Sequence, residues 1–236
     1  MLRLPSAFNQ FPERLNPCAS VATPSEIATA NAVRAEYVLP GQQLPYMEDI
    51  VRAFRIAEGA KIYLEVGTQD KGNLAWLART KLAKGATIID IDLLDYPEND
   101  RKIKSELSRE FDYHSIRADC LNDGTLAKIK DILSGRLADV IFCDSHYTYE
   151  HTLIEFGLYY PLVREGGFLL FHDAQWPGES TSPHEEERKK GKGLAIEQLD
   201  RFYPAWMIVG PQMPPHRPLP PVDRKGHWGT VAIFAP

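Results

Sequence analysis

Short apolar runs alternate with helix-like segments through most of this chain, and this alternation constrains its fold more than any other feature. The strand-like runs span 62–66, 87–91, 113–117, 138–143 and 167–171. Helix-like segments span 47–58, 72–82, 101–111, 126–133, 149–163 and 193–203. Largely apolar strands that alternate with helices predict a parallel sheet covered on both faces, and right-handed crossovers make it doubly wound. We therefore expect an α/β fold with a Rossmann-like, doubly wound and mostly parallel sheet.

The segments around this alternation differ in composition. Residues 1–45 are rich in Pro, Asn, Ser and Gln, with a helix expected over 25–36, and we interpret them as an N-terminal arm or lid on a domain spanning 46–236. Residues 177–193 combine charge with Gly and Pro and predict a mobile loop. Two late strand-like runs, 206–209 and 229–234, predict an antiparallel hairpin at one sheet edge.

Charge and cysteine content disfavour several classes of function. The net charge of −5 suits neither nucleic acid nor an anionic membrane, which both reward clustered Lys and Arg. Three cysteines without paired spacing argue against a disulfide framework or a zinc site. Because the sequence shows neither an apolar run of about 20 residues nor the apolar core of a signal peptide, we expect a cytoplasmic protein.

A glycine turn follows the first strand-like run, at the edge where a doubly wound sheet binds its ligand. The chain reads Glu65-Val66-Gly67-Thr68 there, and Gly72 opens the next helix. Gly67 permits close approach of the backbone to a ligand. Glu65 would repel the pyrophosphate of a dinucleotide, and the G-x-G-x-x-G pattern for such ligands is absent. A cationic ligand such as S-adenosylmethionine tolerates this acid, although Glu65 alternatively only orients the turn.

The second strand-like run ends in two acids, Asp90 and Asp92. A carboxylate at this position can accept hydrogen bonds from both hydroxyls of a ribose. We take Asp92 as the first choice for this contact and Asp90 as the second.

This order of features resembles the class I S-adenosylmethionine-dependent methyltransferases. The resemblance rests on E-x-G after the first strand, a glycine that opens the next helix and an acidic end to the second strand. It implies cofactor contacts from the glycine turn and, beyond it, from the ends of the third and fourth strands. The implied residues are Glu65, Gly67, Thr68, Gly72, Asp119, Cys120 and Asp144, with Asp119 and Cys120 near the adenine.

Two further segments, 139–150 and 160–173, resemble a narrower group, the cephalosporin-hydroxylase and macrocin-type O-methyltransferases. The resemblance covers about residues 60–210 and includes the helix 193–199. Members of this group often hold Mg²⁺ with acids at the ends of these two strands, and Asp144 and Asp173 occupy the matching positions. Such an ion orients the substrate oxygen and lowers its pKa.

The chain departs from this group at two positions. His172 stands where an acid is commoner, so the set Asp144, His172 and Asp173 suits Mn²⁺, Fe²⁺ or Zn²⁺ as well as Mg²⁺. The group's catalytic histidine is replaced by Tyr147, while His146 lies one position earlier. The candidates for a catalytic base are therefore His146, Tyr147 and His172. As alternatives, Asp144 caps the following helix and His172 is a buried, hydrogen-bonded side chain.

These features predict an enzyme that methylates a hydroxyl of a small or medium metabolite, such as a sugar or polyketide. S-adenosylmethionine is the expected cofactor, and a divalent ion, Mg²⁺ or Mn²⁺, is an open addition. A non-catalytic scaffold and an NAD(P)-dependent oxidoreductase remain alternatives. The expected partner is a small molecule and not nucleic acid or membrane, and homo-oligomerisation is left open. Tyr46 and Trp176 either line the substrate cleft or pack on the sheet.

Overall fold

The structure is a computed structural model that describes residues 15–38, 48–174, 191–203, 205–208 and 229–235. Tyr46, Trp176 and most of the predicted loop 177–193 lie outside the described residues, as does part of the predicted arm. Among the described residues, no helix combines the length and apolar character needed to cross a membrane.

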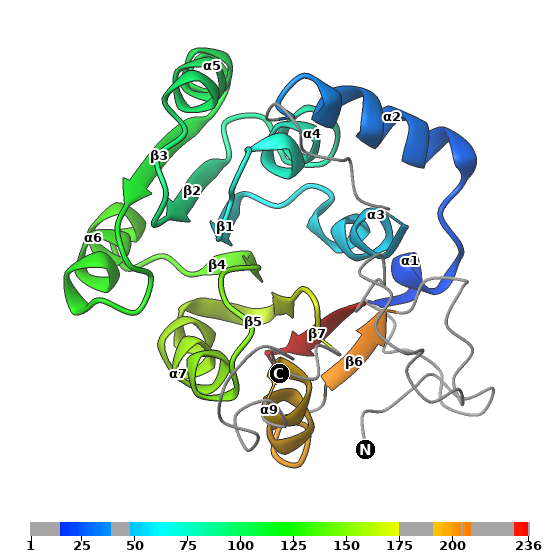
Figure 1. The fold of residues 1–236 in the computed structure, drawn as a ribbon, viewed down its shortest axis with the longest axis vertical. Helices are drawn as coiled ribbons and strands as arrows, with labels where there is room; N and C mark the ends of the chain where they lie inside the picture. Colours follow the sequence, from blue (N-terminus) through cyan, green and yellow to red (C-terminus); the bar gives the residue numbers. More distant parts are fainter. Residues whose placement is uncertain (1–14, 39–47, 175–190, 204, 209–228, 236) are drawn as a thin grey trace, which may run out of the picture.

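In the described part of the chain, seven strands form one sheet in the order β3-β2-β1-β4-β5-β7-β6 (Figure 1). The strands are β1 Ile62–Val66, β2 Thr87–Asp92, β3 Asp112–Arg117, β4 Ala138–Cys143, β5 Val163–Phe171, β6 Ala205–Ile208 and β7 Thr230–Phe234. The first five pair in parallel, while β7 pairs antiparallel with both β5 and β6. The predicted doubly wound sheet with an antiparallel hairpin at its edge is confirmed.

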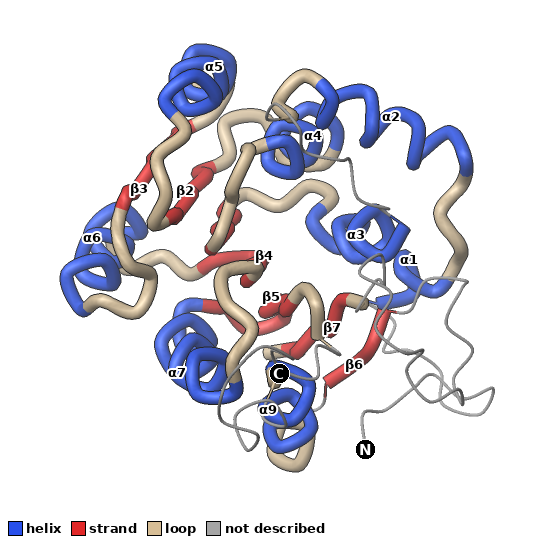
Figure 2. Tube along the Cα trace, viewed as in Figure 1, coloured by secondary structure: helices blue, strands red, loops and turns tan. Residues whose placement is uncertain are grey.

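Helices cover both faces of this sheet (Figure 2). One face carries α3 Glu48–Ala53, the 3₁₀ turn η2 Phe54–Ala57, α4 Gly72–Thr80 and α5 Pro97–Leu107, with α1 Asn16–Ala19 and α2 Pro24–Ala35 outside them. The other face carries α6 Asp123–Leu133, α7 Tyr149–Tyr159, the 3₁₀ turn η3 Tyr160–Leu162 and α9 Lys192–Leu199. Successive strand residues point to opposite faces, so Tyr63 and Leu64 enter separate buried apolar clusters.

Several element boundaries differ from the sequence prediction, and three of these differences have a clear local cause. α5 begins at Pro97 instead of 101, because proline suits the first helical position and the Asp100 side chain accepts from the backbone N–H of Tyr96. β5 begins at Val163 instead of 167, because the strand continues through Gly166–Gly167 with a shift of register against β4. α2 is capped by Thr23, which forms a reciprocal capping box with Glu26.

Candidate active site

A cavity of about 350 Å³ opens at the carboxyl ends of β1, β2 and β4. This volume is in the range of small-molecule sites. Its walls include seven residues that the sequence predicted for the site, namely Gly67, Asp92, Asp119, Cys120, Asp144, His146 and Tyr147. A larger hollow of about 500 Å³ lies beside the edge strand β3, between α5 and α6 and away from these strand ends.

Gly67 lets three strand ends meet at this cavity. Its backbone adopts φ +85°, and a Cβ atom there would lie 2.4 Å from the carbonyl oxygen of Asp144. The Gly67 N–H donates to the Ile91 carbonyl at 2.8 Å, which joins the end of β1 to the end of β2. A side chain would therefore strain the backbone and push β4 away from β1.

Replacing Gly67 with alanine is expected to lower the free energy of unfolding by ~3 kcal/mol or more, since it combines a positive φ with a backbone clash. Gly85→Ala is the matched control: Gly85 also has a positive φ, of +73°, but no atom lies within 4 Å of its added Cβ. We expect ~1 kcal/mol for this control, the ordinary cost of the left-handed conformation. Urea unfolding of both variants measures the difference, and equal losses would contradict the steric role of Gly67.

Asp92 presents its carboxylate to the cavity. The Oδ2 atom accepts from the Gln69 N–H at 2.6 Å, and Oδ1 accepts from the Leu94 N–H at 2.8 Å. Each carboxylate oxygen has room for a second donor. Two backbone bonds thus fix the orientation of Asp92, while both oxygens can still accept from two neighbouring hydroxyls.

Asp90, the second choice for the ribose contact, lies instead in a buried ion cluster. Its Oδ1 lies 3.0 Å from the Lys71 ammonium and 2.9 Å from Nη1 of Arg117. Tyr113 and Thr68 also donate to its carboxylate. Burial opposes the charge of Asp90, but Lys71 and Arg117 outweigh burial and hold its pKa below the usual value. The side chains of Asp90 and Thr68 therefore belong to this cluster and do not line the cavity.

Glu65 is also buried, with 1% of its surface exposed. Its Oε2 accepts from the Tyr63 hydroxyl at 2.8 Å. Burial raises the pKa of Glu65 to about 8, although Tyr63 and Lys71 oppose the shift. Glu65 thus lies beneath the turn, and any effect on a bound cation is electrostatic.

A second group of side chains lies at the ends of β4 and β5. Nδ1 of His172 lies 3.1 Å from Oδ1 of Asp144 and 3.7 Å from Oδ2 of Asp173. Its Nε2 lies 3.5 Å from Oδ2 of Asp49, a buried acid of α3 that the sequence analysis missed. Burial opposes a charge on His172, but Asp144 and Asp173 raise its pKa well above the usual value. Asp144 does not cap α7, because Thr148 occupies the cap position.

These residues fit a divalent metal ion. The ligand atoms of Asp144, His172 and Asp173 all lie within 4.8 Å of one another. Asp49 faces the other ring nitrogen, as carboxylates do behind histidine ligands of metals. A bound ion would replace the proton shared between His172 and its two acids.

The three predicted base candidates have different environments. The exposed ring of His146 lies on the cavity wall, 6.4 Å from the ring of Tyr147. The negative charge of Asp144 and partial burial raise the pKa of Tyr147, which opposes loss of its proton. His172 is held protonated by its acids. Of the three, His146 is the one whose exposed ring lies on the cavity wall.

Comparison with known proteins shows which family part of this chain resembles. Residues 64–174 match the family model of a methyltransferase domain. This similarity runs from within β1 to just past the end of β5. An uncharacterized protein, R132 of Acanthamoeba polyphaga mimivirus, is 28% identical over 117 residues, which cover 48% of this chain. This chain matches about half of that curated relative, 51% of its length.

Solved structures share the fold of this chain at low sequence identity. The O-methyltransferase TomG of Streptomyces achromogenes, in complex with S-adenosylmethionine, has a TM-score of 0.55 and 17% identity, with 92% of each chain covered. MycE of the mycinamycin biosynthetic pathway, in complex with Mg and S-adenosylhomocysteine, has a TM-score of 0.51 and 17% identity. That match covers 91% of this chain and 55% of MycE.

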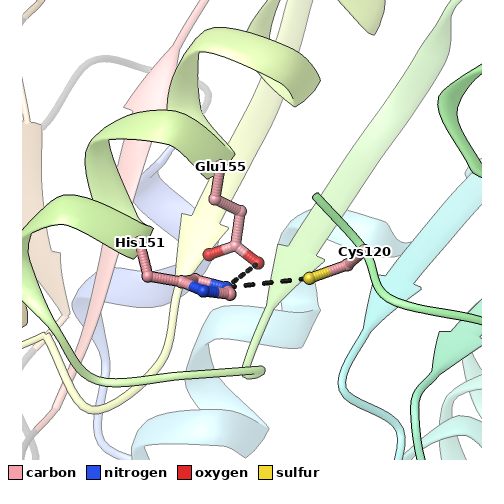
Figure 3. Close-up of side chains that lie close together, drawn as sticks. All are labelled: Cys120, His151 and Glu155. Atoms are coloured by element: carbon pink, nitrogen blue, oxygen red, sulfur yellow. Dashed lines mark hydrogen bonds and ion pairs between the residues drawn. The ribbon is translucent and has the colours of Figure 1, made fainter. Parts of the chain in front are cut away.

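A third polar group, with Cys120 and His151 on the cavity wall, includes the side chains that Figure 3 shows close together. Nε2 of His151 lies 3.7 Å from the Cys120 sulfur and 2.9 Å from the Ser145 hydroxyl. Ser145 donates to Oε1 of the fully buried Glu155 at 2.8 Å. Burial raises the pKa of Glu155 to about 7 and lowers that of His151 to about 4. A neutral imidazole therefore lines the cavity here, and sequence reasoning did not find it.

Glu155 is expected to make the stability of the protein depend on pH. Its pKa is raised from 4.5 to about 7 on folding, so its unfavourable contribution is absent at low pH and grows as pH rises from 4.5 through 7. We expect Glu155→Gln to gain ~2 kcal/mol relative to the wild type between pH 5 and pH 8. Urea unfolding at both pH values measures this gain, with the exposed Glu150→Gln as control. A constant difference across pH would contradict the buried, proton-binding state of Glu155.

Proposed function

We propose that this protein is a methyltransferase that transfers the methyl group of S-adenosylmethionine to a hydroxyl oxygen of a small or medium metabolite, such as a sugar or a polyketide. The observation that carries the proposal is the carboxylate of Asp92, which faces the same cavity as the Gly67 turn and is fixed by two backbone bonds. Asp119 and Cys120 line the same cavity and would contact the adenine of a cofactor whose ribose is held by Asp92.

The acids beside the turn suit the charge of this cofactor. Glu65 and Asp144 lie at the ends of β1 and β4, next to Gly67. The negative charge of Asp144 favours a ligand that carries a sulfonium and an ammonium group, and Glu65, whose pKa burial raises to about 8, adds to this charge only when it ionises. The same acids disfavour a dinucleotide pyrophosphate, which supports a methyl donor over a nicotinamide cofactor.

The reaction requires a positioned oxygen and a group that takes its proton. The oxygen attacks the methyl carbon in line with the sulfur, the S–CH₃ bond breaks, and S-adenosylhomocysteine leaves. We assign the proton to His146, whose ring is exposed on the cavity wall. Asp144, His172 and Asp173 would hold a divalent ion, and such an ion supplies orientation of the substrate oxygen and a lower pKa for its hydroxyl.

The similar folds of TomG and MycE agree with this proposal. TomG is an O-methyltransferase, which supports oxygen as the methyl acceptor here. MycE was solved with Mg together with S-adenosylhomocysteine, which supports an ion in addition to the cofactor. The net charge of −5 supports a small-molecule acceptor over nucleic acid.

Calorimetric titration with S-adenosylhomocysteine tests the cofactor, and transfer of labelled methyl to a panel of hydroxylated sugars and polyketides tests the reaction. We expect micromolar binding, with NADH as the negative control. Tight cofactor binding without transfer to any acceptor would favour a non-catalytic scaffold. Saturable NADH binding without S-adenosylhomocysteine binding would overturn the assignment.

A further inference from the structure

Arg34, in the last turn of α2, is a buried cation with incomplete hydrogen bonding. Only 5% of its surface is exposed. Its Nε and Nη1 atoms have no hydrogen-bond partner among the described residues. A guanidinium stays charged in proteins, and a buried charge without hydrogen bonds is strongly unfavourable. Such a group calls for a further hydrogen-bond partner, which a bound ligand can supply.

Arg34 lies against the glycine turn of the cofactor site. A Cβ atom added at Gly72 would lie 3.2 Å from both Cα and Cβ of Arg34. Gly72, which the sequence analysis assigned to the cofactor, therefore allows α2 to pack closely on the first turn of α4. Figure 1 shows these two helices side by side above the end of β1.

The charges around Arg34 belong to the same strand ends. The carboxylates that act on it most strongly are those of Asp70, Asp144 and Glu65. None of them is hydrogen-bonded to its Nε or Nη1. The nearby Lys71, in contrast, pairs with Asp90 at 3.0 Å and with Asp100 at 3.7 Å. Glu65 accepts from the Tyr63 hydroxyl and Asp144 contacts His172, so these acids have partners of their own. Arg34 thus brings a positive charge to these acids without being hydrogen-bonded to them through its Nε or Nη1.

We propose that Arg34 binds the α-carboxylate of the methionine moiety of the cofactor. This inference rests on the proposed function, because it requires S-adenosylmethionine in the cavity. The amino-acid end of that molecule carries an ammonium, a sulfonium and one carboxylate. The acids match the two cations, while the planar fork of a guanidinium matches a carboxylate through two parallel hydrogen bonds. The N-terminal segment then contributes to cofactor binding through α2.

The test compares two ligands that differ at the amino-acid end. S-adenosylhomocysteine carries the carboxylate, and 5′-methylthioadenosine lacks the whole amino-acid group. We expect Arg34→Met to weaken S-adenosylhomocysteine binding about 10- to 100-fold, the effect of losing hydrogen bonds between charged groups, and to leave 5′-methylthioadenosine binding within about twofold. Arg34→Lys should retain part of the affinity, because it keeps the charge without the fork.

Arg55→Met is the matched control for the docking of the N-terminal segment. Arg55 bonds Glu26 of α2 at 2.7 Å and the carbonyl oxygens of Pro17 and Ser20. Its loss should lower Tm and leave the preference for S-adenosylhomocysteine over 5′-methylthioadenosine unchanged. Arg34→Met should not lower Tm of the ligand-free protein, because it removes a poorly paired buried charge.

The outcomes separate the inference from the proposed function. Wild-type protein that binds neither ligand would remove both. If the wild-type protein binds S-adenosylhomocysteine and the Arg34→Met variant binds it with the same affinity, the role of Arg34 is contradicted and the proposed function is not. An equal loss for both ligands, or a lower Tm in Arg34→Met, would assign Arg34 to packing. A loss of methyl transfer to the acceptor without a loss of S-adenosylhomocysteine affinity would contradict the inference and indicate that Arg34 contacts the acceptor.

Discussion

Asp92→Asn is expected to weaken S-adenosylhomocysteine binding about 100-fold. Hydrogen bonds to charged groups contribute ~1.5–3 kcal/mol each, and every ~1.4 kcal/mol is tenfold in affinity. The asparagine amide replaces one acceptor with a donor, so only one ribose hydroxyl retains an acceptor. That acceptor, the amide oxygen, carries no charge. Calorimetric titration at constant salt measures the loss.

The control for this prediction is Asp119→Asn. Asp119 is an exposed acid on the same cavity wall, and its Oδ1 already accepts from the Leu121 N–H. We expect a loss of less than about tenfold there, since an exposed charge is screened by solvent. Because Asp92 also accepts from Gln69 and Leu94, Tm of both variants must be compared. Tight binding of S-adenosylhomocysteine by a folded Asp92→Asn variant would contradict the ribose contact. The proposed position of the cofactor would then be wrong.

Asp173→Asn is expected to abolish measurable Mn²⁺ binding, with a loss of at least about 100-fold. The substitution removes one of three ligands, whereas loss of an outer partner alone typically costs 10- to 100-fold. Cofactor affinity should change little, because Asp173 does not line the cavity. Titration of Mn²⁺, followed by electron paramagnetic resonance, measures free and bound ion. Glu150→Gln, an exposed acid at the start of α7, is the control.

The pH dependence of Mn²⁺ binding gives a second readout of the same site. The raised pKa of His172 means that the ion must displace a proton near neutral pH. At pH values below that pKa, the affinity for Mn²⁺ should therefore rise by about tenfold for each unit of increase in pH. Binding by Asp173→Asn with wild-type affinity, or binding that does not depend on pH, would show that these residues form a histidine–carboxylate cluster only.

The elements and their order followed from local features of the sequence. Apolar runs predicted the five parallel strands and the terminal hairpin. The glycines at positions 67 and 72 predicted the turn between β1 and the next helix. Element boundaries were predicted less well, as for β5, which was expected to begin at 167 and begins at Val163. Acids at strand ends were informative because all carboxyl ends of a parallel sheet face one edge.

The choice among those acids required the tertiary structure. Asp90 and Asp92 have the same residue type and similar sequence surroundings. Of these two acids, however, only Asp90 pairs with Lys71 and Arg117. Which carboxylate stays available depends on cations from other elements, and no local pattern encodes that pairing.

The sequence by itself determined the doubly wound sheet, the glycine turn and the set of acids from which the cavity is built, because periodicity and strand ends are local properties. Only the tertiary structure brought Asp49 behind His172, Ser145 and Glu155 behind His151, and Arg34 against Gly72. Arg34 and Asp49 come from helices that precede β1 in the chain. Their roles arise from packing between distant segments, where burial and pairing, and not sequence spacing, decide what each side chain contacts.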